Sequence, residues 1–310
     1  MKRAIKIAGW LVLSGGAAYF QFKGIPSFEA QTVNLKVEGT PQQIANGKRI
    51  AALLCVQCHA GNEGKLTGKR ILDLPAEFGE VYSMNITQDP EKGIGNWTDG
   101  QLKYFLRTGI RPNGSYAPPY MPKYPTAADE DLEDIIAWLR SNSAEVQPSQ
   151  EKAPPSKPSL MTKILVNTVM GPMPYPEKRI AKPDTTDQLA LGSYLANSLM
   201  GCFACHSRDF KTNNDLNPVQ FEGYMGGGNP LLDFDGNVVV SSNITFDKTG
   251  IAGWTKEQFI EAVRHAKRPD GSLLRYPMLP QITLTDYEVG SIFEYLKTVP
   301  PIDNPISRAL

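Results

Sequence analysis

Every cysteine of the chain lies in one of two short strings with the same spacing. Residues 55–59 read Cys-Val-Gln-Cys-His and residues 202–206 read Cys-Phe-Ala-Cys-His, and together they use all four cysteines and two of the three histidines. On a helical turn, positions i, i+3 and i+4 share one face. Two thiols and one imidazole are therefore expected on the same side of each string.

Such a face suits the covalent attachment of a porphyrin, because the thiols can add to its two vinyl groups while the imidazole reaches the iron. We therefore predict two covalently bound haem c groups, attached through Cys55, Cys58, His59, Cys202, Cys205 and His206. A zinc site would need four ligands from both strings, and its usual partner spacings are absent. Disulfides across Cys-x-x-Cys would be redox pairs without their usual thioredoxin-like context.

The strings belong to a larger internal repeat. Residues 93–98 (Gly-Ile-Gly-Asn-Trp-Thr) match residues 250–255 (Gly-Ile-Ala-Gly-Trp-Thr) at an offset of 157, and an Asn-Ile-Thr triplet precedes each, starting at Asn85 and Asn243. The strings are offset by only 147, so we place an insertion in the glycine-rich run at residues 223–236. The chain is expected to be a tandem duplication with one haem in each unit.

Each iron needs a second axial ligand. The repeat pairs Met121 with Met278, each in a proline-rich loop. A rigid loop can hold a thioether over the ring, so we predict these two methionines as iron ligands beside the two histidines. The alternative is that each methionine only fills a gap in the core. His265 is the other candidate ligand, but it pairs with Thr108 and is otherwise interpreted as a helix-surface residue.

A tryptophan and an arginine also recur in register, as Trp97 with Trp254 and Arg107 with Arg264. Two interpretations stay open for them. The tryptophan can fill the core beside the ring while the arginine is a solvated helix residue. Alternatively, both side chains hydrogen-bond the haem propionates, as guanidinium does with carboxylates.

Two helices are expected to lead into the strings. Thr40 followed by Pro41 has the pattern of an N-cap and a first helical position, and Thr186 begins the equivalent helix of the second unit. Gly47 and Gly192 lie inside these helices, where glycine is less favourable than alanine by about 1 kcal/mol. We therefore expect each glycine to mark the close approach of another helix.

The expected partner is the last helix of each unit, at residues 129–140 and 286–298. Both segments have acidic residues in the first turn and apolar residues at helical spacing. Strand-like alternation is scarce apart from residues 238–240. The predicted fold class is therefore all-α.

Two domains are predicted, at residues 31–142 and 185–303, joined by a proline-rich linker at residues 143–184. Within the linker, an apolar stretch at residues 160–170 predicts a helix packed across both domains, with an amphipathic membrane contact as the alternative. The formal net charge is zero, with 32 basic and 32 acidic side chains, which argues against general nucleic-acid binding.

The first 23 residues have the pattern of a targeting segment. A positively charged start precedes 16 uncharged residues, 7–22, closed by Lys23. That length exceeds a typical signal-peptide core and is slightly short for a transmembrane helix. We predict that residues 1–23 form an N-terminal membrane anchor, with a cleaved signal as the alternative, followed by a tether at residues 23–39. Either places the protein on the periplasmic face of the cytoplasmic membrane.

Both units resemble class I cytochrome c domains. The Asn-Ile-Thr triplet followed by the Gly-Ile-x-x-Trp-Thr motif is similar to the cytochrome c subunits of membrane-bound alcohol and gluconate dehydrogenase complexes. The resemblance covers about residues 40–140 and 185–300. It implies the axial ligand pairs His59–Met121 and His206–Met278. Those subunits commonly carry three haems, whereas this sequence has strings for two.

The resemblance predicts an electron carrier rather than an enzyme. An iron with two protein ligands has no open position for a substrate, and methionine raises the potential of a haem. Redox partners are expected: a dehydrogenase or quinol-oxidising complex as donor, and an oxidase or another cytochrome as acceptor. The alternative enzyme is a dihaem cytochrome c peroxidase, for which only His265 offers a displaceable ligand. A structural or sensory haem module would need an output domain, which the sequence lacks.

Overall fold

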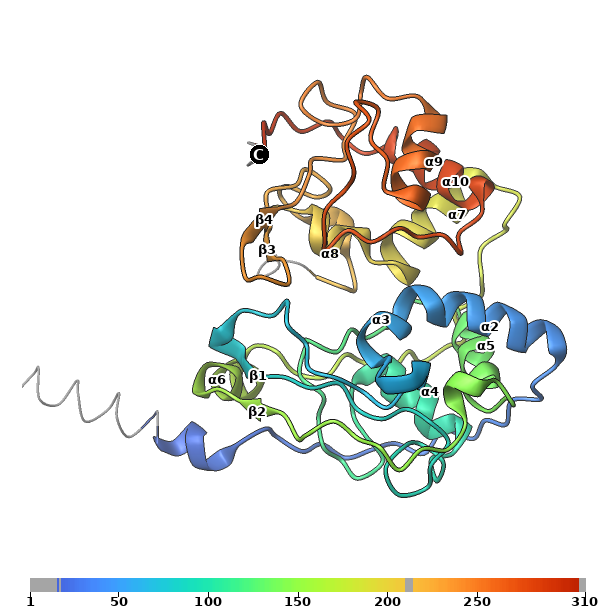
Figure 1. The fold of residues 1–310 in the computed structure, drawn as a ribbon, viewed down its shortest axis with the longest axis vertical. Coiled ribbons are helices and arrows are strands. Elements are labelled where there is room, and N and C mark those ends of the chain that lie inside the picture. The colour runs from blue at the N-terminus through green and yellow to red at the C-terminus, as the bar shows by residue number, and fades with distance from the viewer. Residues whose placement is uncertain (1–15, 17, 210–213, 307–310) are drawn as a thin grey trace, which may run out of the picture.

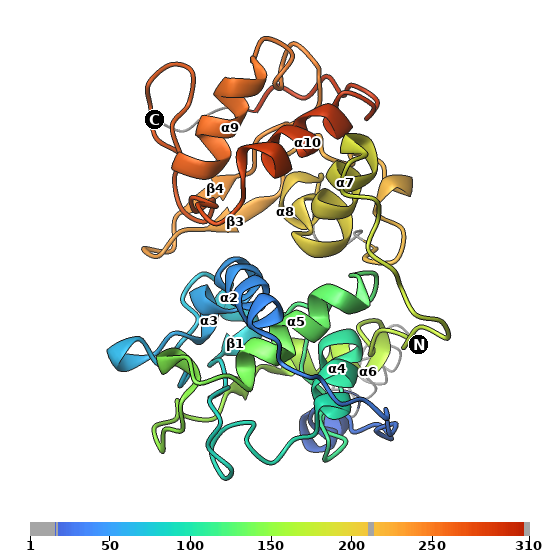
Figure 2. The same cartoon turned by 90° about the vertical axis from the view of Figure 1, so that its right-hand side faces the viewer.

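The computed structural model describes residues 16, 18–209 and 214–306. Figure 1 shows two bodies stacked along the long axis, and Figure 2 shows the same separation after a quarter turn. We call residues 18–184 the first unit and residues 185–306, apart from 210–213, the second unit. Helices dominate both units and their strands are short, which confirms the helical class predicted from the sequence.

Among the named elements of the first unit, the helix that leads into the first string comes first, and α6 of the proline-rich segment comes last. Its elements are α2 (Pro41–Leu54), α3 (Val56–His59), η1 (Asn62–Gly64), η2 (Ala76–Phe78), β1 (Gly79–Glu80), α4 (Asp99–Thr108), α5 (Asp129–Leu139), η3 (Ala144–Val146), β2 (Lys157–Pro158) and α6 (Leu160–Thr168). β1 and β2 pair antiparallel.

The second unit repeats the order of the main helices. Its elements are α7 (Gln188–Tyr194), the π-helical turn η4 (Leu195–Leu199), α8 (Cys202–His206), η5 (Pro218–Gln220), β3 (Pro230–Leu232), β4 (Val238–Val240), α9 (Lys256–His265) and α10 (Asp286–Leu296). β3 and β4 form an antiparallel hairpin at the glycine-rich run where we placed the insertion. β4 coincides with the strand predicted at residues 238–240.

In each unit, the helix that leads into the string packs against the last helix. A Cβ atom added to Gly47 of α2 would lie 1.8 Å from the carbonyl oxygen of Asp134 in α5. A Cβ atom added to Gly192 of α7 would lie 2.0 Å from the carbonyl oxygen of Ser291 in α10. Only glycine fits such a close crossing, so the predicted reason for both glycines is confirmed.

The apolar faces of the two last helices form much of the core, as predicted. The buried residues are Leu132, Ile135, Ile136 and Leu139 of α5, and Val289, Ile292, Phe293 and Leu296 of α10. One helix start differs from the prediction. Asp187, rather than Thr186, caps α7, since its carboxylate accepts the backbone N–H groups of Leu189 and Ala190 at 2.9 and 3.1 Å.

The end of the proline-rich segment is fastened to the first unit. The N–H of Ile180 donates to Asp129 at 2.7 Å, and Lys182 pairs with Asp131 at 2.7 Å. Earlier in the same segment, α6 packs on η2 of the first unit. The whole stretch therefore lies along the first unit before the chain enters α7.

The membrane anchor predicted for residues 1–23 is corrected by the structure. Within the described residues, none of the helices combines the length and apolar character that crossing a bilayer requires. Residues 1–15 and 17 of the predicted anchor lie outside the described residues. The described remainder is a short helical turn that ends at Lys23, on which Phe22 is 90% exposed.

The stretch that follows this turn was expected to be a tether, but it packs on the first unit. The N–H of Phe28 donates to the carbonyl oxygen of Gly114 at 2.8 Å, and the N–H of Val37 donates to Asp99 at 3.0 Å. These contacts fix residues 28–37 along the surface that carries α4.

Polar contacts join the two units directly. Arg49 of α2 pairs with both carboxylate oxygens of Glu288 in α10 at 2.9 Å. The Tyr194 hydroxyl of α7 donates to Asp131 of α5 at 2.5 Å and accepts the N–H of Ala128 at 3.0 Å. The interface therefore runs along α2 and α5 on one side and α7 and α10 on the other.

Candidate haem sites

The first string follows directly from α2. Thr40 forms a capping box with Gln43, with bonds of 3.1 and 3.3 Å between each side chain and the other's backbone N–H. The helix runs from Pro41 to Leu54, as predicted, and Cys55 connects it to α3. Cys55 and His59 are 8% and 6% exposed, so the string faces the interior of the first unit.

The second string starts after a break in the backbone. Gly201 has the left-handed conformation, with φ +61°, and ends the π-helical turn before α8 begins at Cys202. Cys202 and His206 are partly buried and Cys205 is exposed. All four cysteines of the chain are free thiols, which leaves them available for thioether bonds.

Both histidines are oriented by the same kind of hydrogen bond. His59 Nδ1 lies 2.7 Å from the carbonyl oxygen of Met84, and His206 Nδ1 lies 2.9 Å from that of Ser242. A carbonyl oxygen can only accept, so Nδ1 carries the proton and Nε2 keeps its lone pair for a metal. Burial lowers the pKa of both imidazoles, which favours this neutral form.

The Asn-Ile-Thr triplet positions these two carbonyl groups, because each asparagine directly follows Met84 or Ser242. Asn85 Oδ1 accepts the N–H of Thr87 at 2.8 Å, and Asn243 Oδ1 accepts the N–H of Thr245 at 2.9 Å. The side-chain amides donate to the chain that follows the last helix, at the carbonyl oxygens of Ser149 and Glu151 in the first unit and of Ile302 in the second.

The glycine of the Gly-Ile-x-x-Trp-Thr motif lies against this triplet. A Cβ atom at Gly93 would lie 2.2 Å from the carbonyl oxygen of Thr87, and one at Gly250 would lie 2.3 Å from that of Thr245. The next N–H in each motif donates to that same oxygen, at 2.8 and 3.0 Å. The sequence showed that both motifs recur, but not that together they hold the carbonyl group that orients the histidine.

The two candidate methionine ligands have matching backbone geometry. The N–H of Met121 donates to the carbonyl oxygen of Pro118, and that of Met278 donates to that of Arg275, both at 3.0 Å. Three residues later, each loop is bonded at 2.9 Å to the preceding long helix, α4 or α9. Both methionines are partly buried. Their shared register in the sequence therefore corresponds to a shared local structure.

The recurring arginines fasten these methionine loops to the last helices. Arg107 is fully buried and donates to the carbonyl oxygens of Tyr124 and Pro125 at 2.9 Å and to Asp129 at 3.1 Å. Arg264 pairs with Asp286 at the start of α10. The interpretation of Arg107 as a solvated helix residue is therefore wrong. In both arginines the Nε–H group is buried and has no partner among the described residues.

The alternative chemistries fit this geometry less well. Burial, aided by the neighbouring cysteine of each pair, raises the pKa of Cys55 and of Cys202 to about 12, whereas redox-active Cys-x-x-Cys pairs have lowered pKa values. Within the described part of the chain, no group of three or more His, Cys, Asp or Glu side chains is arranged to hold a bare metal ion. His265 is exposed at the end of α9.

Comparison with known proteins agrees with this geometry. Residues 44–143, from within α2 to just beyond α5, match the family described as Cytochrome c. This match assigns a cytochrome c domain to the first unit.

The chain is also similar to longer cytochrome subunits and to a dihaem cytochrome. It is 28% identical over 258 residues to an alcohol dehydrogenase (quinone) cytochrome c subunit of Gluconacetobacter polyoxogenes, covering 80% of this chain and 54% of that protein. It is 30% identical over 274 residues to a fructose dehydrogenase cytochrome subunit of Gluconobacter japonicus, covering 83% of this chain and 52% of that protein. A dihaem c-type cytochrome of Cereibacter sphaeroides is 27% identical over 323 aligned positions, covering 98% and 100%.

The chain thus spans about half the length of the dehydrogenase subunits and the full length of the dihaem cytochrome. These relatives confirm the resemblance on which the sequence analysis relied.

Proposed function

We propose that this protein is a dihaem c-type cytochrome that carries electrons on the periplasmic side, between a dehydrogenase or quinol-oxidising complex and a terminal acceptor. The main support is that both units contain a pair of free thiols followed by a histidine whose Nδ1 faces a backbone carbonyl oxygen. A periplasmic location is supported by the chemistry of the strings, because haem is attached to such cysteines outside the cytoplasm.

The residues of both units fit a covalently attached haem. Cys55, Cys58, Cys202 and Cys205 would form the thioether bonds. His59 and His206 would bind the iron through Nε2, and Met121 and Met278 would supply the second axial ligand. The unpartnered Nε–H groups of Arg107 and Arg264 are buried donors suited to an acidic group such as a propionate. That use is compatible with the bonds that their terminal nitrogens make to the protein.

A haem bound in this way supplies an iron that gains or loses one electron. The role of the protein is to keep its own structure unchanged when the iron gains or loses an electron. The hydrogen bond at Nδ1 fixes each imidazole ring, and α2 and α7 fix the cysteines relative to it. The arginines hold the methionine loops close to the last helices. If the histidine and the methionine of each unit both bind the iron, no position would remain on it for a substrate, which favours a carrier over an enzyme.

The proposal is tested first by counting haems. Mass spectrometry and alkaline pyridine spectra of the purified protein should show two covalently bound haems per chain. The double variant Cys55→Ala with Cys58→Ala, and its counterpart Cys202→Ala with Cys205→Ala, should each retain one. A native protein with one haem or none, or with haem that acid acetone extracts, would refute the proposal.

A second measurement separates the carrier from the peroxidase. The reduced protein should pass electrons to an oxidised soluble cytochrome quickly and turn over hydrogen peroxide negligibly. Sustained peroxide-dependent oxidation of a cytochrome donor would favour the enzyme instead. A dehydrogenase partner is supported by the names of several relatives, and co-purification of the native protein with a dehydrogenase would identify it.

A further inference from the structure

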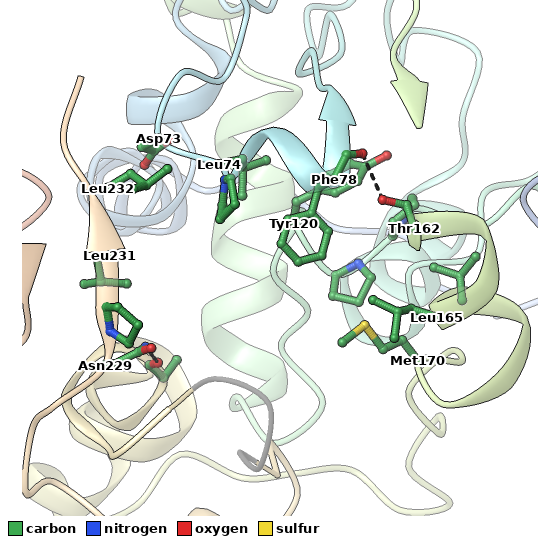
Figure 3. A pocket seen from close by; sticks show the side chains of 16 residues that line it. Asp73, Leu74, Phe78, Tyr120, Thr162, Leu165, Met170, Asn229, Leu231 and Leu232 are labelled. Atoms are coloured by element: carbon green, nitrogen blue, oxygen red, sulfur yellow. Dashed lines mark hydrogen bonds between the residues drawn. The ribbon is translucent and has the colours of Figure 1, made fainter. Parts of the chain in front are cut away.

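A cavity of about 210 Å³ lies between the first unit, including its helix α6, and the second unit. Figure 3 shows Asp73 and Tyr120 of the first unit and Leu231 of the second among the residues that surround it. Ala204, which lies between the two cysteines of the second string, also lines it, and Tyr120 directly precedes Met121. Parts of both candidate haem sites therefore border one interface.

Asp73 is bonded across this interface. Its carboxylate accepts a hydrogen bond from the hydroxyl of Tyr276, which lies two positions before Met278. The same tyrosine is hydrogen-bonded to Gln57, inside the first string, and its ring stacks on Phe234 with centroids 3.7 Å apart. One acidic side chain of the first unit is thus tied to the methionine loop of the second unit, beside the first string.

Asp73 therefore borders both strings. Together with Ala204, which lies between the two cysteines of the second string, it lines the cavity. Through Tyr276 it also shares a hydrogen-bonding partner with Gln57, which directly precedes Cys58 in the first string.

We propose that Asp73 is a negative charge shared by the two haem sites, which lowers the reduction potentials of both irons together. This rests on the proposed function, because it requires a haem in each unit. Reduction adds one electron to a site and makes it less positive, so a nearby carboxylate favours the oxidised state. Screening is weaker in a partly buried interface than in water, which lets one carboxylate act on both sites. No proton moves and no bond changes at Asp73 in this step.

The proposal is tested by potentiometric titration of the full-length holoprotein. Asp73→Asn keeps the shape of the side chain and an acceptor for the Tyr276 hydroxyl while removing the charge. Both reduction potentials should rise, with a change of about three- to tenfold in each reduction equilibrium constant, at 59 mV per tenfold for one electron. Asp73→Glu keeps the charge and should leave both potentials close to the native values.

Two control variants remove an exposed carboxylate from each unit. Glu91→Gln and Asp303→Asn change side chains that are 71% and 59% exposed, and both variants should leave the two potentials unchanged. The proposal is overturned if Asp73→Asn shifts one potential only, or neither. A haem count below two in the native protein would instead refute the proposed function, and this count precedes the titration.

Discussion

At the scale of single residues, the two candidate ligand histidines are oriented by backbone carbonyl groups. Each Nδ1 faces a carbonyl group whose position depends on the asparagine that follows it in the chain. A histidine whose ring is fixed in this way presents Nε2 in one direction. The placement of the two candidate methionines depends on their loops, which are bonded to α4 and α9.

The methionine assignment predicts an optical change in the holoprotein. Met121→Ala and Met278→Ala should each remove about half of the charge-transfer absorption that a methionine–iron bond gives near the red end of the ferric spectrum. The reason is that each thioether serves one of the two irons. Met161→Ala is the matched control, because Met161 lies on α6 and is 47% exposed. An unchanged band in either test variant would show that its methionine is not a ligand.

The asparagines should contribute to stability as well as to orientation. Asn85→Ala removes the acceptor for Thr87 and the donor to the carbonyl oxygens of Ser149 and Glu151. Because the buried N–H of Thr87 loses its acceptor, the free energy of unfolding of the holoprotein should fall by about 1–3 kcal/mol. Chemical denaturation followed at the haem absorption band measures this.

The control for this change is Asn113→Ala, at an asparagine that bonds only within an exposed turn. An exposed substitution of this kind should change stability by less than about 0.5 kcal/mol. Equal losses at the two positions would contradict the role given to Asn85.

At the scale of elements, each string is positioned by a pair of crossed helices. The crossing of α7 and α10 is close because Gly192 has no side chain, and Gly290 of α10 provides a comparison in the same pair. A Cβ atom at Gly290 would have Lys256 Cδ as its nearest neighbour, at 3.4 Å, which is an ordinary contact with a flexible side chain.

These two glycines predict changes of opposite sign. Gly192→Ala should lower the free energy of unfolding by about 1–3 kcal/mol or more, since the added methyl group would meet the backbone of α10. Gly290→Ala should raise it by about 0.5–1 kcal/mol, because alanine is the better helix former. Thermal unfolding of the two variants and of the native holoprotein measures these differences in stability. A stabilised Gly192→Ala variant would mean that the helices do not cross as described.

The same elements show what the sequence could and could not predict. The helix start at Thr40, the two glycine crossings and the apolar faces of the last helices follow from local rules, and the structure confirms them. The sequence prediction gave no residue range for α4 or α9. Their starts are nevertheless signalled by Thr98 and Thr255, each of which forms a capping box with the glutamine three residues later.

Contacts between residues far apart in the chain could not be predicted from the sequence. The carbonyl groups that meet the histidines lie 25 and 36 residues away along the chain, and no side-chain pattern identifies a backbone acceptor. The bond between Asp73 and Tyr276 joins residues 203 positions apart, in segments that are not repeats of each other. Such pairings depend on how the two units dock.

At the scale of the whole molecule, the interface should make the two units unfold together. Arg49 and Glu288 form one contact, and Tyr194 with Asp131 forms another at a different pair of helices. Domains that share an interface of this kind move independently unless enough contacts cross it. The proline-rich segment adds a covalent connection that is itself bonded to α5.

This arrangement predicts a single calorimetric transition for the native holoprotein and two transitions for the double variant Arg49→Ala with Tyr194→Phe. Arg49 is partly exposed, so its ion pair contributes about 1 kcal/mol, and the buried tyrosine hydroxyl contributes a similar amount. Lys248→Ala removes an exposed ion pair within the second unit and should leave the transition unchanged. Two transitions in the native protein would show that the units already unfold independently, and that these contacts between α2, α5, α7 and α10 do not couple them.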